Sequence, residues 1–229
     1  MGIEQFYILD LFCGAGGFSY GMEKNRHFKT VISLDNDPYV GETFKKNMPW
    51  CDVVVGDITS SDIKDKIMSK ALSMGVNMII GGPPCQGFSN KGKKKGLEDP
   101  RNFLFREYLA FVERLQPKVF VIENVKTLLS ASNGWFRKEI LSSISKLGYQ
   151  VDFGVLNASC FGVPQARERT VFICCKDKKI MLPKASVSQI TTVRDAIGDL
   201  AYLESGEGTF EDRYRTEATS DYQMLMRSG

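Results

Sequence analysis

One cysteine of this chain directly follows two prolines, in the segment 81–89 with the sequence GGPPCQGFS. Proline fixes the backbone angle φ, lacks an N–H donor and restricts the residue before it to an extended conformation. Cys85 is therefore held in a stiff frame, just beyond the apolar run 76–80. A cysteine that only fills space in a core needs no such frame. We interpret Cys85 as a positioned nucleophile.

Two more segments carry side chains that could assist such a nucleophile. Glu123 follows the apolar run 119–122, and a glutamate buried there can have a raised pKa and act as an acid. A helix N-cap or a salt-bridge partner is the alternative for an isolated Glu-Asn-Val tripeptide. Arg167 and Arg169 alternate in the segment 165–169, so their side chains point the same way, toward one anion or carbonyl. The alternative there is a solvated strand edge.

A further segment could hold a ligand. Residues 10–19, DLFCGAGGFS, predict a strand, a glycine turn and the start of a helix, whose amides favour an anionic group. Gly14 and Gly16 fit the dinucleotide pattern G-x-G-x-x-G, but Ser19 occupies the place of the third glycine. Asp35 follows about 20 residues later, where an acidic residue can bind ribose hydroxyls. A turn with a solvated carboxylate is the alternative.

The elements that position these residues follow from short apolar runs that alternate with amphipathic segments. Ligands bind at the carboxyl ends of strands in open α/β sheets. Asp57 and Ile58 follow the apolar run 53–55, where Asp57 could hold an adenine amino group and Ile58 could pack on the adenine ring. Asp also caps helices, as we expect of Asp37 before Pro38. The β-α-β alternation predicts an α/β fold with a doubly wound, mostly parallel sheet. We expect strands at 6–9, 31–34, 53–55, 76–80, 119–122, 150–156 and 170–175, and helices at 38–47, 62–74, 102–115, 136–147 and 192–200.

Composition and cysteine usage narrow the class of protein. The chain has 229 residues, 43% of them hydrophobic and 25% charged, which suits one large α/β domain or a domain with a small appendage. Its net charge of +3 permits nucleic-acid binding without arguing for it. The six cysteines form no C-x-x-C pair and none has metal-ligand spacing from His27, so we expect no metal site. With no signal peptide and no apolar stretch near the roughly 20 residues of a membrane span, we expect a cytoplasmic protein with reduced thiols and no membrane partner.

Taken together, these segments resemble the DNA (cytosine-5) methyltransferases. Four segments carry the resemblance, in the order and approximate spacing of that family: 10–19, 81–89, 123–125 and 165–169. Weaker matches, also in order, extend it over nearly the whole chain: 56–58, 101–105 and 161–164. The resemblance implies a Rossmann-like methyltransferase fold that uses S-adenosylmethionine and releases S-adenosylhomocysteine.

The family's pattern implies roles for individual residues. Cys85 would add to carbon 6 of a cytosine flipped out of the duplex, which makes carbon 5 able to attack the methyl donor. Glu123 would contact cytosine N3 and the exocyclic amine, and Arg169 would hold the cytosine carbonyl. Arg167 would be a second donor near the cysteine loop. The implied cofactor contacts are Phe12, Gly14, Gly16, Asp35, Asn36, Asp57, Ile58, Pro83 and Leu104.

The chain also departs from the family. After 192–197 it reaches 222–227 and ends, whereas family members continue into a target-recognition domain and a closing segment near the cofactor. We therefore expect a catalytic and cofactor-binding domain at 1–182 and a linker at 183–229 that leads toward an absent target-recognition domain. Two explanations are open: a catalytic subunit with a separate second subunit, or a fragment of a longer chain. Both predict that this chain is inactive or weak alone and needs the missing part to methylate double-stranded DNA in a restriction–modification system.

Other functions stay open at this stage. One is an RNA cytosine-5 methyltransferase, although its transfer-RNA branch favours Pro-Phe-Thr where residues 87–89 of this chain read Gly-Phe-Ser. Another is a non-catalytic, DNA-associated paralogue, although Cys85, Glu123 and Arg169 are all present. A nicotinamide oxidoreductase fits poorly, because the glycine pattern is incomplete and no hydride-transfer partner is evident.

Overall fold

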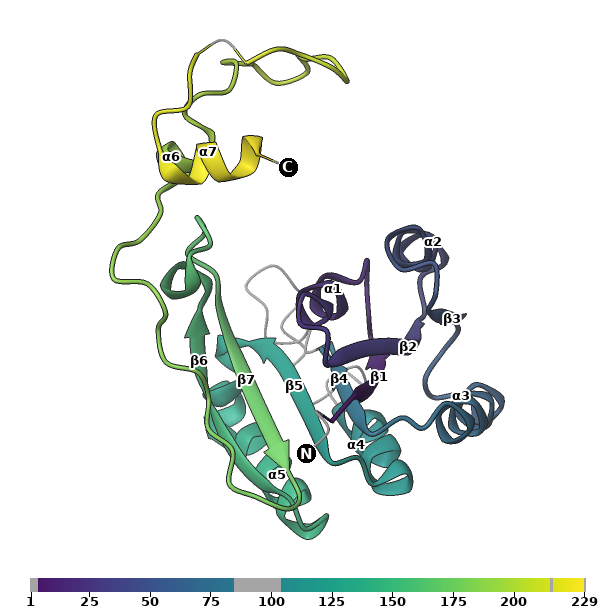
Figure 1. Cartoon of the computed structure of the whole chain (residues 1–229). Coiled ribbons are helices and arrows are strands. Elements are labelled where there is room, and N and C mark those ends of the chain that lie inside the picture. Colours follow the sequence, from purple (N-terminus) through teal and green to yellow (C-terminus); the bar gives the residue numbers. More distant parts are fainter. Residues whose placement is uncertain (1–3, 85–103, 215, 229) are drawn as a thin grey trace. The chain divides into compact units, whose positions relative to one another are not determined.

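The computed structural model describes residues 4–84, 104–214 and 216–228 (Figure 1). The chain forms two compact units. The first comprises Met1–Val155 and Arg169–Leu182, and the second comprises Leu156–Glu168 and Pro183–Gly229. Most of the predicted site residues belong to the first unit.

A seven-stranded sheet in the order β3-β2-β1-β4-β5-β7-β6 forms the framework (Figure 1). Strands β3, β2, β1, β4 and β5 pair in parallel, whereas β7 pairs antiparallel with β5. The expected α/β fold with a mostly parallel sheet is confirmed. The strands are β1 (Phe6–Leu11), β2 (Phe28–Asp35), β3 (Asp52–Val55), β4 (Met78–Gly81), β5 (Val119–Val125), β6 (Gln150–Asn157) and β7 (Glu168–Cys175).

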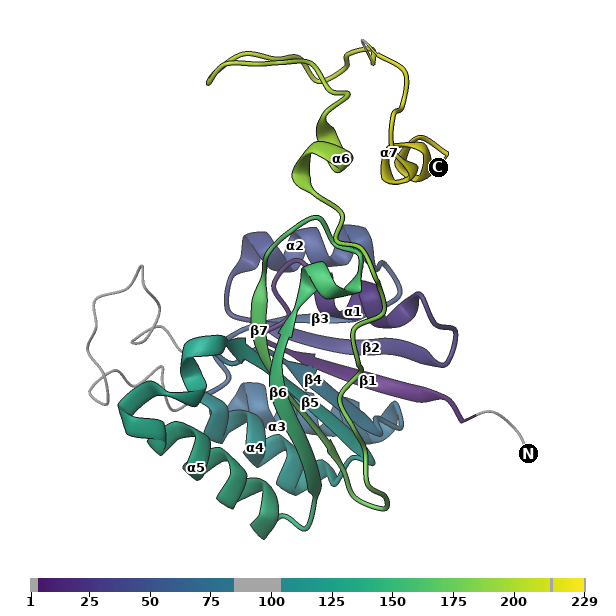
Figure 2. The same cartoon turned by 90° about the vertical axis from the view of Figure 1, so that its left-hand side faces the viewer.

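Helices cover both faces of this sheet (Figure 2). On one face lie α1 (Gly17–Glu23) and α2 (Pro38–Asn47), and on the other lie α3 (Ser61–Ser73), α4 (Leu104–Leu115) and α5 (Ala131–Lys146). The larger core lies under the second group, where Ile67, Tyr108 and Phe136 pack with the strands. Asp37 caps α2 as expected, since its side chain accepts the Tyr39 N–H at 2.8 Å. Short 3-10 helices follow β5 and β6: η4 (Lys126–Leu129) and η5 (Ala158–Phe161).

The central strands approach each other closely near their carboxyl ends. Gly81 ends β4 against β1, and a Cβ on this glycine would lie only 2.2 Å from the Leu11 carbonyl oxygen. On the face covered by α3, α4 and α5, the Tyr108 hydroxyl lies 3.1 Å from the Ile79 carbonyl oxygen and 2.9 Å from that of Val121. This packing brings the ends of β1, β4 and β5, which carry predicted site segments, to one edge of the sheet.

The second unit contains two short helices, α6 (Val193–Ile197) and α7 (Asp221–Arg227). Thr192 and Asp195 form a capping box at the start of α6, which is shorter than the expected helix at 192–200. The helix α7 was not expected from the sequence. Its N-cap is Ser220, whose hydroxyl accepts the Gln223 N–H at 3.1 Å.

Candidate active site

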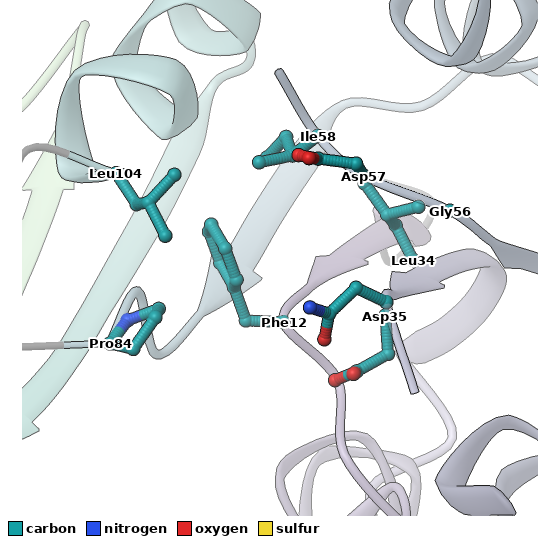
Figure 3. Close-up of a pocket in the computed structure, with 9 residues that line it drawn as sticks. Phe12, Leu34, Asp35, Gly56, Asp57, Ile58, Pro84 and Leu104 are labelled. Atoms are coloured by element: carbon teal, nitrogen blue, oxygen red, sulfur yellow. The ribbon is translucent and has the colours of Figure 1, made fainter. Parts of the chain in front are cut away.

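A pocket opens where β1, β2 and β3 end (Figure 3). The Phe12 ring projects into it, between the side chains of Leu104 and Ile58 in the view of Figure 3. Its lining consists of Phe12, Leu34, Asp35, Asn36, Gly56, Asp57, Ile58, Pro84 and Leu104. The expected cofactor contacts within this lining are Phe12, Asp35, Asn36, Asp57, Ile58 and Leu104. Three expected contacts, Gly14, Gly16 and Pro83, do not line it, and Pro84 does so next to Pro83.

The turn between β1 and α1 has an unusual backbone. Phe12, Gly14 and Gly16 all have positive φ, at 60°, 52° and 91°. Side chains are strained in that region, so the two glycines suit the turn and Phe12 adopts it at a cost. Gly16 also leaves no room for a side chain, because a Cβ would lie 2.9 Å from the Phe44 ring. Gly14 and Gly16 therefore shape the turn, and they do not line the pocket.

Two carboxylates at the pocket are held by backbone groups. Oδ2 of Asp35 accepts the Gly14 N–H at 2.9 Å, and Oδ1 accepts the Asp37 N–H at 3.1 Å. Each carboxylate oxygen can accept a second hydrogen bond, so Asp35 can fix the turn and still receive hydroxyl groups. Oδ1 of Asp57 accepts the N–H and the hydroxyl of Thr59, both at 2.8 Å, and these bonds lower the pKa of Asp57. Asp57 is thus ionised at neutral pH, with Oδ2 available as an acceptor.

Asp10 is a buried carboxylate near the end of β1, for which no role was expected from the sequence. It is 1% exposed, and its Oδ2 accepts the Ser19 hydroxyl at 2.5 Å. Burial raises the pKa of Asp10 to about 7, while the hydrogen bond from Ser19 opposes the rise and the nearby Asp35 adds to it. A charged residue inside the apolar strand FYILDL was the available signal. The pair spans the glycine turn and joins β1 to α1.

Glu123 and Arg169 meet on neighbouring strands. Nε of Arg169 lies 2.9 Å from Oε1 of Glu123, and the two side chains are 28% and 33% exposed. Gly82 lies against the same carboxylate, because a Cβ there would be 3.0 Å from Glu123 Oε2. The structure therefore brings together two residues that were expected at one site, beside a segment that leads into Cys85.

Two other expected catalytic residues are not part of this pair. Cys85 lies outside the described residues. Arg167 is exposed and belongs to the second unit, whereas Glu123 and Arg169 belong to the first. Its N–H donates to the Gln165 carbonyl at 2.8 Å, and its carbonyl accepts the Ala158 N–H at 2.9 Å. These contacts fix the Arg167 backbone and leave its role a prediction.

Three described cysteines have the surroundings of packing groups. Cys13, Cys51 and Cys174 are buried. Burial raises the pKa of Cys51 to about 12, and it also raises the pKa of Cys13 and Cys174. The thiolate is the reactive form of cysteine, so a raised pKa makes these three thiols inert.

The pocket suits a flat, largely apolar ligand that carries hydrogen-bond donors. Phe12 and Ile58 offer apolar surface, and Asp35 and Asp57 offer acceptors. Among the described lining residues there is no Lys or Arg, so a phosphate group would meet two carboxylates without a compensating cation. Over residues 4–84, 104–214 and 216–228, no group of three or more His, Cys, Asp or Glu could hold a metal ion. In the same part of the chain, no helix is both long and apolar enough to cross a membrane.

Comparison with known proteins gives one consistent family. The family model for C-5 cytosine-specific DNA methylases matches residues 6–227. The chain is 43% identical over 205 residues to the Type II methyltransferase M1.HphI of Haemophilus parahaemolyticus, covering 88% of this chain and 54% of that protein. It is 38% identical over 232 residues to M.DdeI of Desulfomicrobium norvegicum, covering 97% of this chain and 55% of that protein. It is 40% identical over 177 residues to M.AquIA of a Picosynechococcus species, covering 72% of this chain and 70% of that protein.

Solved structures agree. A putative DNA modification methyltransferase encoded within an E. coli prophage matches with a TM-score of 0.72 and 28% identity, over 87% of this chain and 56% of that one. The Entamoeba histolytica methyltransferase EhMeth matches with a TM-score of 0.61 over 81% and 58%, and at 23% identity it supports the fold alone. The chain thus spans about half the length of M1.HphI and M.DdeI, at 54% and 55%.

Proposed function

Because this chain belongs to the C-5 cytosine-specific DNA methylases, we propose that it is the catalytic part of an enzyme that methylates carbon 5 of cytosine in DNA, within a restriction–modification system. The family and the fold imply a methyl donor of the S-adenosylmethionine type. One observation carries the proposal: the Glu123–Arg169 ion pair lies against Gly82, three residues before Cys85. An acid and a cation beside the segment that leads to Cys85 suit the attack of a cysteine on a heterocyclic base, because they can stabilise the charge that develops on the base.

Cys85 is the proposed nucleophile. Its thiolate adds to carbon 6 of a flipped-out cytosine, and the electron pair of the 5,6 double bond becomes available at carbon 5. Carbon 5 takes the methyl group, then loses its proton to water as the bond to sulfur breaks and Cys85 leaves as thiolate. Glu123 protonates or hydrogen-bonds N3 and accepts from the exocyclic amine, while Arg169 holds the carbonyl as negative charge develops. Arg167 is proposed as a second donor.

The described pocket supports S-adenosylmethionine as the donor. When bound, this cofactor supplies an electrophilic methyl group on sulfur. Asp35 would accept from the ribose hydroxyls and Asp57 from the adenine amino group, with Asn36 beside it. Phe12 and Ile58 would pack on the adenine, and Leu104 near the methionine end. Gly14, Gly16 and Pro83 would act from behind this lining, and the two carboxylates disfavour a cofactor with a diphosphate.

Trapping on duplex DNA that contains 5-fluorocytosine tests the reaction. Fluorine at carbon 5 cannot leave as a proton does, so the thiol adduct persists after methyl transfer. The wild-type chain, combined with the target-recognition part proposed below, should give a covalent complex that depends on S-adenosylmethionine, and Cys85→Ser with the same part should give none. If the wild type also gives no covalent complex, the protein is a non-catalytic paralogue and the proposal is wrong. Stronger methylation of transfer RNA than of duplex DNA would favour an RNA substrate instead.

Double-stranded DNA is the proposed substrate, and its recognition is proposed to require more than this chain. The chain spans about half of M1.HphI and M.DdeI, at 54% and 55%. We propose that the remaining half provides target recognition, either in the same polypeptide or as a second subunit.

A further inference from the structure

We infer that Asn124 is a positioning residue for this reaction: its side-chain amide fixes the Pro83–Pro84 segment between the cofactor pocket and the Glu123–Arg169 pair. The inference rests on the proposed function for its catalytic part. It concerns a residue that acts through Pro83, without contact to the base or the cofactor.

Asn124 makes two hydrogen bonds with a side chain that is buried. The residue is 7% exposed, its Nδ2 donates to the Pro83 carbonyl at 2.8 Å, and its Oδ1 accepts the Val125 N–H at 2.9 Å. The second bond orients the amide so that its donor faces Pro83. On the opposite side, the Asn124 backbone pairs with Thr170 of β7. The amide therefore connects a strand held by β7 to a segment that leaves β4.

The amide replaces backbone pairing that cannot continue. The ladder between β4 and β5 ends where Gly81 pairs with Ile122. Pro83 and Pro84 have no N–H, so this segment cannot donate to β5. The Pro83 carbonyl lies in a buried residue, and an acceptor left unpaired in such a place is costly. The Asn124 amide donates to this carbonyl and so defines where the segment runs.

Two walls of the site depend on this segment. Pro84 lines the cofactor pocket, and Gly82 lies against the Glu123 carboxylate. Cys85 follows Pro84 directly in the sequence. A displacement of Pro83 would therefore change the pocket wall and the approach to Glu123 together, which is why the effect should reach both cofactor affinity and turnover.

Asn124→Asp tests this because its effect depends on pH. The acid form can donate its O–H to the Pro83 carbonyl, whereas the carboxylate would place an oxygen against an oxygen, and burial raises the pKa of such an acid. With the chain and the proposed target-recognition part together, the ratio of kcat for Asn124→Asp to that for wild type should fall about tenfold or more as pH rises. Asn124→Ala should lose about 10- to 100-fold in kcat at every pH and bind S-adenosylmethionine severalfold more weakly by calorimetry. All rates are measured well below the melting temperature of each variant.

Thr170→Val is the matched control. The Thr170 hydroxyl is also buried and lies 3.4 Å from the Val125 carbonyl on the same strand pair, but it does not reach Pro83. Its kcat and cofactor Kd should stay within about twofold of wild type. Wild-type kcat and Kd in Asn124→Ala would overturn the inference, as would a loss in Asn124→Asp that is the same at every pH. If the wild type forms no adduct on 5-fluorocytosine DNA, the proposed function fails, and the cofactor Kd of Asn124→Ala still decides whether Asn124 positions the pocket wall.

Discussion

At the scale of single residues, two carboxyl groups of this protein have opposite surroundings. Glu123 is partly exposed and faces Arg169 at 2.9 Å, whereas Asp10 is buried and receives the Ser19 hydroxyl at 2.5 Å. The first arrangement suits a group that meets a substrate. The second suits a group that holds a turn, and each leads to a different measurement.

Glu123→Gln keeps the shape of the side chain but removes the charge and the ability to deliver a proton. Loss of proton transfer to N3 should lower kcat by about 10²- to 10⁴-fold, with a smaller effect on cofactor Kd. Transfer of a tritiated methyl group to DNA measures the first, and calorimetry the second. Glu113→Gln, an exposed glutamate on α4, should behave as wild type. Glu123→Gln with more than a tenth of wild-type kcat would contradict the proposed role.

Asp10 should make stability depend on pH in a defined direction. Its pKa rises from the ordinary value of 3.8 to about 7 in the folded state, so between these values the folded protein holds a proton that the unfolded chain has released. Stability must then fall as pH rises through this window and level off above pH 7. Asn in place of Asp10 removes that dependence. The difference in unfolding free energy between wild type and Asp10→Asn should therefore change by roughly 2–3 kcal/mol between pH 5 and pH 8.

Urea unfolding at both pH values checks this effect. Asp57→Asn is the matched control, because the pKa of Asp57 is lowered in the folded state. The contribution of Asp57 to stability therefore changes at lower pH than that of Asp10, and it increases as pH rises. Ser19→Ala should raise the pH at which Asp10 titrates in the folded protein, since it removes the hydrogen bond that favours ionised Asp10. Parallel curves for wild type and Asp10→Asn would show that Asp10 titrates normally in the folded state.

At the scale of elements, the sequence predicted most strands because parallel strands buried on both faces read as continuous apolar runs. It also predicted that Glu123 and Arg169 belong to one site. The antiparallel direction of β7 could not be predicted, since direction depends on how the chain returns and not on local pattern. The helix α7 was missed because seven residues are too few to show a helical period in the sequence. Asn124 and Asp10 were assigned no role, because their partners are 41 and nine residues away.

The two glycines of the β1–α1 turn allow a test of what that turn requires. Both have positive φ, but a Cβ on Gly14 meets nothing within 4 Å, whereas one on Gly16 would lie 2.9 Å from the Phe44 ring. Gly14→Ala should cost about 1–2 kcal/mol of unfolding free energy from backbone strain alone. Gly16→Ala should cost about 1–3 kcal/mol more through overpacking, and should weaken cofactor binding more strongly. Equal losses in chemical denaturation would show that the contact with Phe44 relaxes without cost.

At the scale of the whole molecule, the chain spans about half of M1.HphI and M.DdeI, at 54% and 55%. Its second unit carries large apolar side chains that are more than half exposed, among them Val193, Ile197, Leu200 and Leu225. The pocket and the Glu123–Arg169 pair belong to the first unit, so we expect the proposed target-recognition part to act mainly through the second unit.

The last prediction follows from this division. The purified chain should bind S-adenosylmethionine weakly and should methylate DNA only when a target-recognition part is added, for example that of M1.HphI, which is 43% identical to this chain over 205 residues. With the part from M1.HphI, the methylated site should be the one that M1.HphI recognises, because the proposed catalytic residues come from this chain and the added part would select the DNA. Methyl transfer to a set of DNA duplexes of different sequence measures both the activity and the methylated site. Cys85→Ser combined with the same added part is the control. Robust, sequence-specific methylation by the chain alone would show that these 229 residues already contain what recognition requires.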